Sequence, residues 1–413
     1  MRQVRWASWM VGLAMALAVC GVRPVAADIR SDQAAAIVEW PSVIFLGAGD
    51  IGQPFLIDTV IQLTNTDTSQ PVNAHCFFEN ANSHCTNTGE VCLVAQQCCT
   101  PETGCGICKP GWNETDFHIR LTPAQPFGWV ASDGAAGFDP FPSPPTEVGT
   151  FPLDGVTAVG HCTPDVPAAA CSNAGSRIPP VPEEPFNGAL RCIAVDDDGV
   201  PVDRNVLKGE ATITFVDKNR DPETISVAKH NAIGVQAIPG ANNGDNILVL
   251  GGPPDAAEYN GCPNFLILNH FFDGAINPVI NRDDAQIETA LTLVPCGANF
   301  LRQFPGDTPA PIVVQYLVFN EFEQRFSASK SVFCKQLILL SNIDTPQNER
   351  SIFSAGIAGT LTGQTRINPL DGGMFAVATE IHEITDPPPL ADFNVHYQGD
   401  RTDPDVIVLP PVP

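Results

Sequence analysis

The sequence predicts an all-β protein built from two antiparallel β-sandwich domains of the Ig-like type, and three observations lead to that prediction. The 413-residue chain holds 39 prolines, nearly twice the usual share of about 5%. Short β-rich runs, bounded by Gly, Pro, Asn and Asp, recur along it. No amphipathic segment of helical length carries helix caps. Proline interrupts helices but suits short strands joined by turns, so these features favour sandwiches.

The β-rich runs form two groups, one for each expected domain. The first group comprises residues 37–45, 55–63, 72–78, 116–121, 127–130, 189–195, 211–216 and 225–238. The second comprises residues 264–272, 287–294, 312–322, 332–340, 352–361 and 374–381. Turn-forming residues are dense between the two groups. We therefore expect domain one at 28–238 with a long proline-rich loop at 138–185, a linker at 239–261, domain two at 262–386 and an extended C-terminal tail at 387–413.

The first 27 residues have the organisation of a secretory signal peptide. Arg2 and Arg5 precede an uncharged apolar stretch at 10–19, and small residues at 25–27 suit cleavage before Asp28. The apolar stretch is shorter than the roughly 20 residues that span a bilayer, and no transmembrane segment is expected after signal removal. A less favoured alternative is that residues 17–20 resemble a bacterial lipoprotein box, in which Cys20 would be lipidated. The predicted location is outside the cell, at its surface or in a periplasm.

The charge balance is strongly acidic, with 46 Asp and Glu against 21 Lys and Arg and a net charge of −25. Such a surface repels nucleic acid and anionic lipid, so nucleic acid is excluded as a partner. Solubility outside the cell is a sufficient explanation of this acidity. Bound divalent cations are the main functional alternative.

The best metal candidate is the run Asp-Asp-Asp-Gly at 196–199, followed by Asp203. Hard cations such as Ca²⁺ bind several carboxylate oxygens on a tight turn, which makes Asp196, Asp198 and Asp203 weak candidate ligands. The run lacks the Glu that closes an EF-hand loop. A hairpin turn, which also needs Asp and Gly, is the simpler explanation. No cofactor is otherwise expected.

Cysteine usage also favours export. Of the 14 cysteines, Cys20 lies in the predicted signal, and the remaining 13 are expected in disulfides apart from an odd one. Six of them crowd a short segment that we expect to form an insertion at 82–111 held together by disulfides rather than by a core. The insertion can serve as a rigid loop between strands or as a recognition surface. Its cysteines are Cys85, Cys92, Cys98, Cys99, Cys105 and Cys108.

This six-cysteine segment, CTNTGEVCLVAQQCCTPETGCGIC, resembles the inhibitor cystine knot and related modules of secreted proteins. The resemblance covers residues 85–108 only, and the last loop is shorter than usual in that family. The family's pairing would join Cys85 to Cys99, Cys92 to Cys105 and Cys98 to Cys108. Fifteen pairings of six cysteines are possible.

A further disulfide is expected between Cys296 and Cys334 in domain two. Both cysteines end apolar runs, and strand-borne cysteines can bridge the two sheets of a sandwich. Cys262, at the domain boundary, is the alternative partner for either of them.

No catalytic motif stands out in the sequence. Glu380 and His382 share one face of a predicted strand, but two ligands do not make a metal site. We therefore expect a non-catalytic, exported protein with a structural, adhesive or ligand-binding role, whose partner is an extracellular protein or a glycan. The alternative is a secreted hydrolase or carbohydrate-active protein, because the acidic residues of a glycosidase meet only in the fold.

Overall fold

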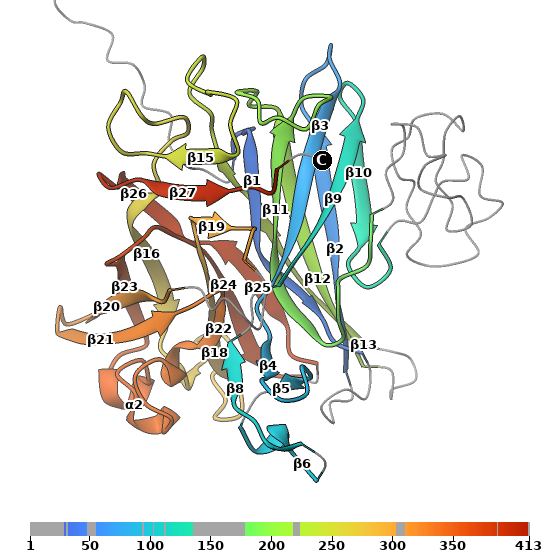
Figure 1. The fold of residues 1–413 in the computed structure, drawn as a ribbon. Coiled ribbons are helices and arrows are strands. Elements are labelled where there is room, and N and C mark those ends of the chain that lie inside the picture. The colour runs from blue at the N-terminus through green and yellow to red at the C-terminus, as the bar shows by residue number, and fades with distance from the viewer. Residues whose placement is uncertain are drawn as a thin grey trace, which may run out of the picture.

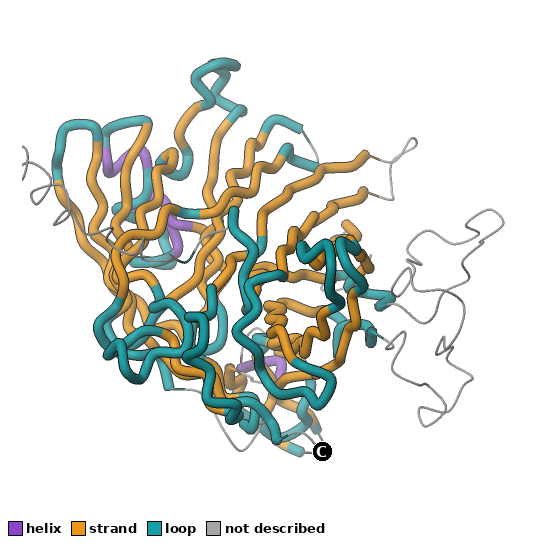
Figure 2. The backbone as a smooth tube through the Cα atoms, turned by 90° about the horizontal axis from the view of Figure 1, so that it is seen from above, coloured by secondary structure: helices purple, strands orange, loops and turns teal. Residues whose placement is uncertain are grey.

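The computed structural model describes residues 29, 32–47, 55–92, 95–101, 103–110, 113–134, 178–217, 224–302, 310–385 and 387–411. The predicted signal peptide with Cys20 lies outside these residues, as does most of the loop at 138–185. Figures 1 and 2 show that strands make up most of the described chain, so the all-β prediction is confirmed. The described helices are short, and none of them is both long and apolar enough to cross a membrane.

The first sandwich consists of a five-stranded and a four-stranded antiparallel sheet. The five-stranded sheet has the order β14-β1-β11-β3-β9, and the four-stranded sheet has the order β10-β2-β12-β13. Their bounds are β1 Ile37–Phe45, β2 Phe55–Asn65, β3 Val72–Asn80, β9 Asn113–Leu121, β10 Pro126–Val130, β11 Phe186–Val195, β12 Leu207–Asp217, β13 Thr224–Asn231 and β14 Ile233–Val235.

The core of the first sandwich fills the space between its sheets. Trp40 on β1 and Trp129 on β10 are fully buried in it. Gly209 on β12 faces Trp40 so closely that a Cβ there would lie 2.0 Å from the indole ring. A disulfide joins Cys76 on β3 to Cys192 at the paired position on β11, within one sheet.

The second sandwich also has two antiparallel sheets. One has the order β21-β20-β23-β16-β26, and the other has the order β17-β18-β24-β25, with β22 paired to β18. Their bounds are β16 Pro263–Phe271, β17 Ala275–Ile276, β18 Gln286–Pro295, β20 Ile312–Asn320, β21 Arg325–Val332, β22 Gln336–Leu339, β23 Thr362–Pro369, β24 Met374–Glu383, β25 Leu390–Asn394 and β26 His396–Asp400. Short helical turns, η4 Leu340–Asn342, η5 Asn348–Arg350 and α2 Ala355–Ala358, cover one end of this sandwich.

Two segments expected to lie outside the sheets are part of them. The supposed linker 239–261 contains β15 Ile247–Leu250, which pairs with β27 Asp405–Val408. The supposed tail 387–413 contributes β25, β26 and β27 to three different sheets. β25 and β26 are edge strands, where a neighbouring proline costs no ladder hydrogen bond. Proline content therefore misled the prediction for this region.

A third sheet, β15-β27-β19 with β19 at Ala298–Asn299, lies beside the first sandwich in Figure 1. Its buried residues Leu248 and Ile407 belong to the same core cluster as Trp40. Phe300 and Phe375 extend that cluster into the second half of the chain. The two sandwiches therefore meet across a packed seam rather than through a flexible connection.

Candidate functional site

The seam between the sandwiches places β13 of the first beside β25 of the second. Side chains link the two strands at each end. The Ser226 hydroxyl donates to the Pro388 carbonyl at 2.6 Å, and the Asn394 side-chain amide donates to the Asn231 carbonyl at 2.9 Å. The two strands meet through side chains, which leaves room for a cavity beside them.

A cavity of about 430 Å³ opens at this seam. Its walls come from seven strands of both sandwiches and from the prolines that precede β25. Carbon side chains dominate its lining, and the polar side chains in it are Ser42, Thr379 and Asp392. We call this cavity the seam pocket, and its lining residues are Ser42, Ile44, Ile213, Phe215, Ala228, Ala290, Leu337, Ile338, Leu339, Thr379, Ile381, Pro387, Pro388, Leu390 and Asp392.

Asp392 on β25 is the ionisable residue of the seam pocket lining. Its side chain is 1% exposed. One carboxylate oxygen accepts a hydrogen bond from the Thr379 hydroxyl at 2.5 Å. The other lies 3.1 Å from Nδ1 of His230, a fully buried side chain on β13. A buried His–Asp contact thus joins the two sandwiches beside the pocket.

A second buried cluster, which we call the clasp, joins the sandwiches elsewhere along the seam. It consists of Arg191 on β11 with Glu39 on β1 and Glu79 on β3. Nε of Arg191 lies 2.6 Å from Glu39 and 3.1 Å from Glu79. Its terminal nitrogens donate to the Pro295 and Cys296 carbonyls at 3.0 and 2.9 Å. The guanidinium therefore connects three strands of one sandwich to the end of β18 in the other.

Burial shapes the pKa values in the clasp. It raises the pKa of Glu79 to about 8, because removing the carboxylate from water outweighs the attraction of Arg191. Burial also raises the pKa of Glu39 above its ordinary value. Nearby, burial lowers the pKa of Lys335 to about 7, and the Lys335 ammonium donates to the Gly188 carbonyl. Arg191 is the cation that contacts both carboxylates of the clasp.

The predicted metal ligands do not assemble into a site. Asp196 accepts hydrogen bonds from the backbone N–H groups of Asp198 and Val200, so it closes its own turn. Gly199 in that turn has φ +80°. Asp203 instead accepts from the Gly240 N–H. The hairpin-turn interpretation of this run therefore fits the contacts. Among the described residues, the two groups with three potential ligand atoms within 4.8 Å of one another both contain disulfide cysteines.

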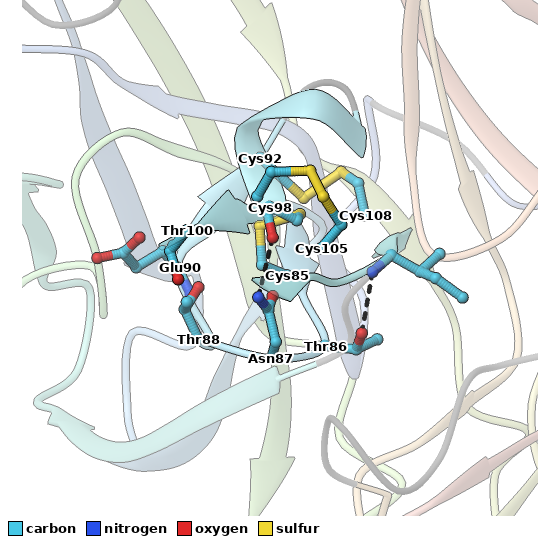
Figure 3. The surroundings of a disulfide bond; sticks show 12 residues. Cys85, Thr86, Asn87, Thr88, Glu90, Cys92, Cys98, Thr100, Cys105 and Cys108 are labelled. Atoms are coloured by element: carbon cyan, nitrogen blue, oxygen red, sulfur yellow. Dashed lines mark hydrogen bonds between the residues drawn. A yellow bond between two sulfur atoms is a disulfide. The ribbon is translucent and has the colours of Figure 1, made fainter. Parts of the chain in front are cut away.

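The six-cysteine insertion forms a module with three disulfides, as Figure 3 shows in part. The bonds are Cys85–Cys98, Cys92–Cys108 and Cys99–Cys105. The expected stapling is confirmed, but the pairing implied by the cystine knot resemblance is wrong. Cys99 lies directly opposite Cys105 on the small β6–β7 ladder, β6 Cys99–Thr100 with β7 Gly104–Cys105, which brings those two sulfurs together.

The module projects from one end of the first sandwich, through β4 Ser83–Cys85, β5 Val91–Cys92, η2 Ala95–Cys98 and β8 Cys108–Pro110. Its base is fixed to the sandwich by Glu183. That carboxylate contacts the imidazole of His84 at 2.9 Å and accepts from the side-chain amides of Asn80 and Asn82.

The predicted Cys296–Cys334 bond is wrong, because Cys296 bonds Cys262, the alternative partner. Gly373 makes room for this pair: a Cβ there would lie 2.3 Å from Cys262 Cβ and 2.9 Å from Cys296 Sγ. Cys334 is buried, and burial raises the pKa of its thiol.

A polar hollow of about 500 Å³ lies at the end of the second sandwich, lined among others by Glu321, Gln364 and Glu380. Its polar groups bond to each other or to the chain. Glu321 accepts from the Thr362 N–H and hydroxyl, which lower its pKa. Glu380 contacts His382 at 2.7 Å, as expected from their shared face. The seam pocket is the better candidate, because most binding sites are apolar with few polar groups.

Comparison with known proteins adds no assignment. No protein-family model matches the chain, and no curated protein matches its sequence. The seam pocket was missed by sequence reasoning because its lining residues are spread from Ser42 to Asp392. The Pro387–Pro388 pair, which was interpreted as part of a tail, lines the pocket directly before the edge strand β25.

Proposed function

We propose that this chain is an exported β-sandwich protein that binds a small apolar ligand in the seam pocket. Export accords with the disulfides, of which five lie among the described residues. Of the structural, adhesive and ligand-binding roles open to such a protein, the seam pocket favours ligand binding.

The observation behind this proposal is an apolar cavity of about 430 Å³ between two domains. Ligand sites of about 300–1,000 Å³ occur preferentially at domain interfaces and combine apolar walls with a few placed polar groups. An unfilled apolar volume also costs stability, because its lining atoms lose dispersion contacts. A ligand that restores those contacts would stabilise the fold.

Binding of a neutral fluorescent hydrophobe, N-phenyl-1-naphthylamine, tests the proposal. We expect saturable binding that Ala228→Phe and Ala290→Leu weaken about tenfold. Excluding roughly 60 Å² of apolar ligand surface costs ~1.5 kcal/mol, which corresponds to that factor. Val227→Phe is the matched control, because Val227 neighbours Ala228 on β13 but is 48% exposed. Equal affinity in all four proteins would place the probe elsewhere and refute the proposal.

The alternative, a hydrolase or carbohydrate-active protein, has one observation in its favour. Glu321 and Glu380 line the same polar hollow. A glycosidase needs one carboxyl group kept protonated as the general acid. The lowered pKa of Glu321 argues against that role for it, so we prefer the seam pocket.

A further inference from the structure

One edge of the second sandwich offers unpaired backbone groups. β21 ends the sheet β21-β20-β23-β16-β26, and β20 is the one strand that pairs with it among the described residues (Figure 1). At the start of this hairpin the Asn320 N–H donates to the Gln324 carbonyl. Bonded and non-bonded residue pairs alternate along an antiparallel ladder. The backbone N–H and C=O groups of Ser327, Ser329 and Ser331 therefore point away from β20.

The other edges of the two sandwiches are protected. β9 carries Glu114 and Asp116, and β10 has five residues and begins at Pro126. β13 and β25 lie beside each other, and β26 contains Gly399 and ends at Asp400. β14, β17 and β22 have at most four residues each. Charges, prolines and short length commonly keep sheet edges from pairing. By contrast, β21 has eight residues, RFSASKSV, without proline, glycine or an acidic residue.

The sequence of β21 is complementary to itself in an antiparallel pair. If two copies pair about Ala328, Ser327 of one copy lies opposite Ser329 of the other. On the opposite face of the strand, Phe326 lies opposite Lys330 of the second copy. In this register no like charges face each other directly, which would be destabilising in a cross-strand pair. The outward N–H groups of each copy also meet outward carbonyls of the other.

The charge of this edge also suits a second copy. The chain has a net charge of −25, so two copies in general repel each other. The charged residues of β21 are Arg325 and Lys330, and the Lys330 ammonium donates to the Asn342 carbonyl at 3.1 Å. Ser327 and Ser329 between them are neutral and exposed. Two copies can therefore meet along β21 without bringing carboxylates of this strand together.

We propose that β21 is the contact strand of a homodimer, in which two copies pair antiparallel about Ala328 and join their five-stranded sheets into one. Main-chain hydrogen bonds supply the affinity when a strand is added at an open sheet edge. The contact is small, so we expect a reversible equilibrium between monomer and dimer. It lies apart from the residues that line the seam pocket, so the two proposals are tested independently.

Sedimentation equilibrium of Ser329→Pro and Ser329→Ala tests this proposal. Proline removes the outward N–H, which an edge strand tolerates because that group bonds no neighbour in its own sheet. Each dimer loses two hydrogen bonds, so we expect the dissociation constant to rise at least about tenfold. Ser329→Ala keeps the N–H and should change the constant less than about threefold. A wild-type chain that stays monomeric into the millimolar range, or a dimer that Ser329→Pro leaves intact, would overturn the proposal.

Amide hydrogen exchange of the unmodified protein gives a second measurement, which does not depend on the folding of a variant. We expect exchange in residues 325–332 to slow as the protein concentration rises, because the outward N–H groups become bonded only in the dimer. The β9 edge at residues 113–121 is the internal control and should not respond. If the protein dimerises while exchange in residues 325–332 stays constant, the contact lies elsewhere and the proposal fails.

Discussion

The clasp and the seam pocket join the same two sandwiches in opposite ways. In the clasp, a buried guanidinium is surrounded by two carboxylates and two carbonyl oxygens. In the seam pocket, apolar side chains from both sandwiches face a space that they do not fill. Protein interiors are normally packed as densely as organic crystals, so the unfilled part is the exception. The comparison indicates that the clasp fixes how the sandwiches dock, whereas the pocket is left for a ligand.

The largest expected effect is on the clasp. Arg191→Met leaves Glu39 and Glu79 buried without a cation, and removing one partner of a buried pair typically costs about 3–5 kcal/mol. Urea unfolding measures this loss. Replacing all three residues together, with Glu39→Leu and Glu79→Leu, should recover at least half of it, because a packed apolar cluster of similar volume needs no charge. A loss below about 1 kcal/mol in Arg191→Met would show that the clasp does not hold the seam.

Much of the fold could be predicted from local patterns. Apolar runs such as 37–45, 264–272 and 374–381 match β1, β16 and β24 closely, because the period of two in a strand is readable in few residues. β23 was missed because it carries polar residues, with Thr365 and Ile367 on its buried face. The predicted strand at 352–361 was wrong. It contains α2, and Gly359 at φ +70° ends that helix with its N–H bonded to the Ala355 carbonyl.

The seam could not be predicted in the same way. Glu39 and Arg191 sit in strands that were predicted, and Glu79 lies one residue beyond the predicted strand at 72–78, but a charged residue in or beside an apolar run does not reveal its partners. Ala228 and Ala290 have the pattern of ordinary core positions, because alternation reports burial and not whether the buried space is filled. The disulfide partners could not be predicted either, because the pairing of cysteines depends on strand register rather than on the spacing of cysteines along the sequence.

A smaller effect concerns how the stability that the clasp contributes depends on pH. The pKa of Glu79 is raised from 4.5 to about 8, so the folded state binds more protons than the unfolded state between these values. The contribution of Glu79 to stability is therefore complete below pH 4.5 and is lost as the pH rises toward 8, by up to roughly 1.4 kcal/mol per pH unit.

Unfolding in urea from pH 5 to 7 measures this slope, with Glu79→Gln expected to flatten it. The window ends at 7 because Lys335, whose pKa is lowered to about 7, contributes a slope of opposite sign above that value. A slope that survives in Glu79→Gln would assign the proton uptake to other buried acids.

The smallest expected effect concerns the unfilled space itself. Ala228→Ile adds three carbon atoms to a side chain that lines a cavity of about 430 Å³. Each buried methylene group stabilises the fold by about 0.8 kcal/mol. The lost rotamer freedom and local adjustment largely offset this gain, so the stability should change by less than about 1 kcal/mol.

The matched control is Ala211→Ile on the neighbouring strand β12. Ala211 is fully buried in the packed core of the first sandwich, where overpacking costs about 1–3 kcal/mol. Thermal unfolding of the two variants compares them directly. Equal losses of stability in both variants would mean that the seam pocket is as densely packed as the core and holds no space for a ligand. If Ala228→Ile is tolerated while Ala211→Ile destabilises the protein, the seam contains unfilled space that the core lacks.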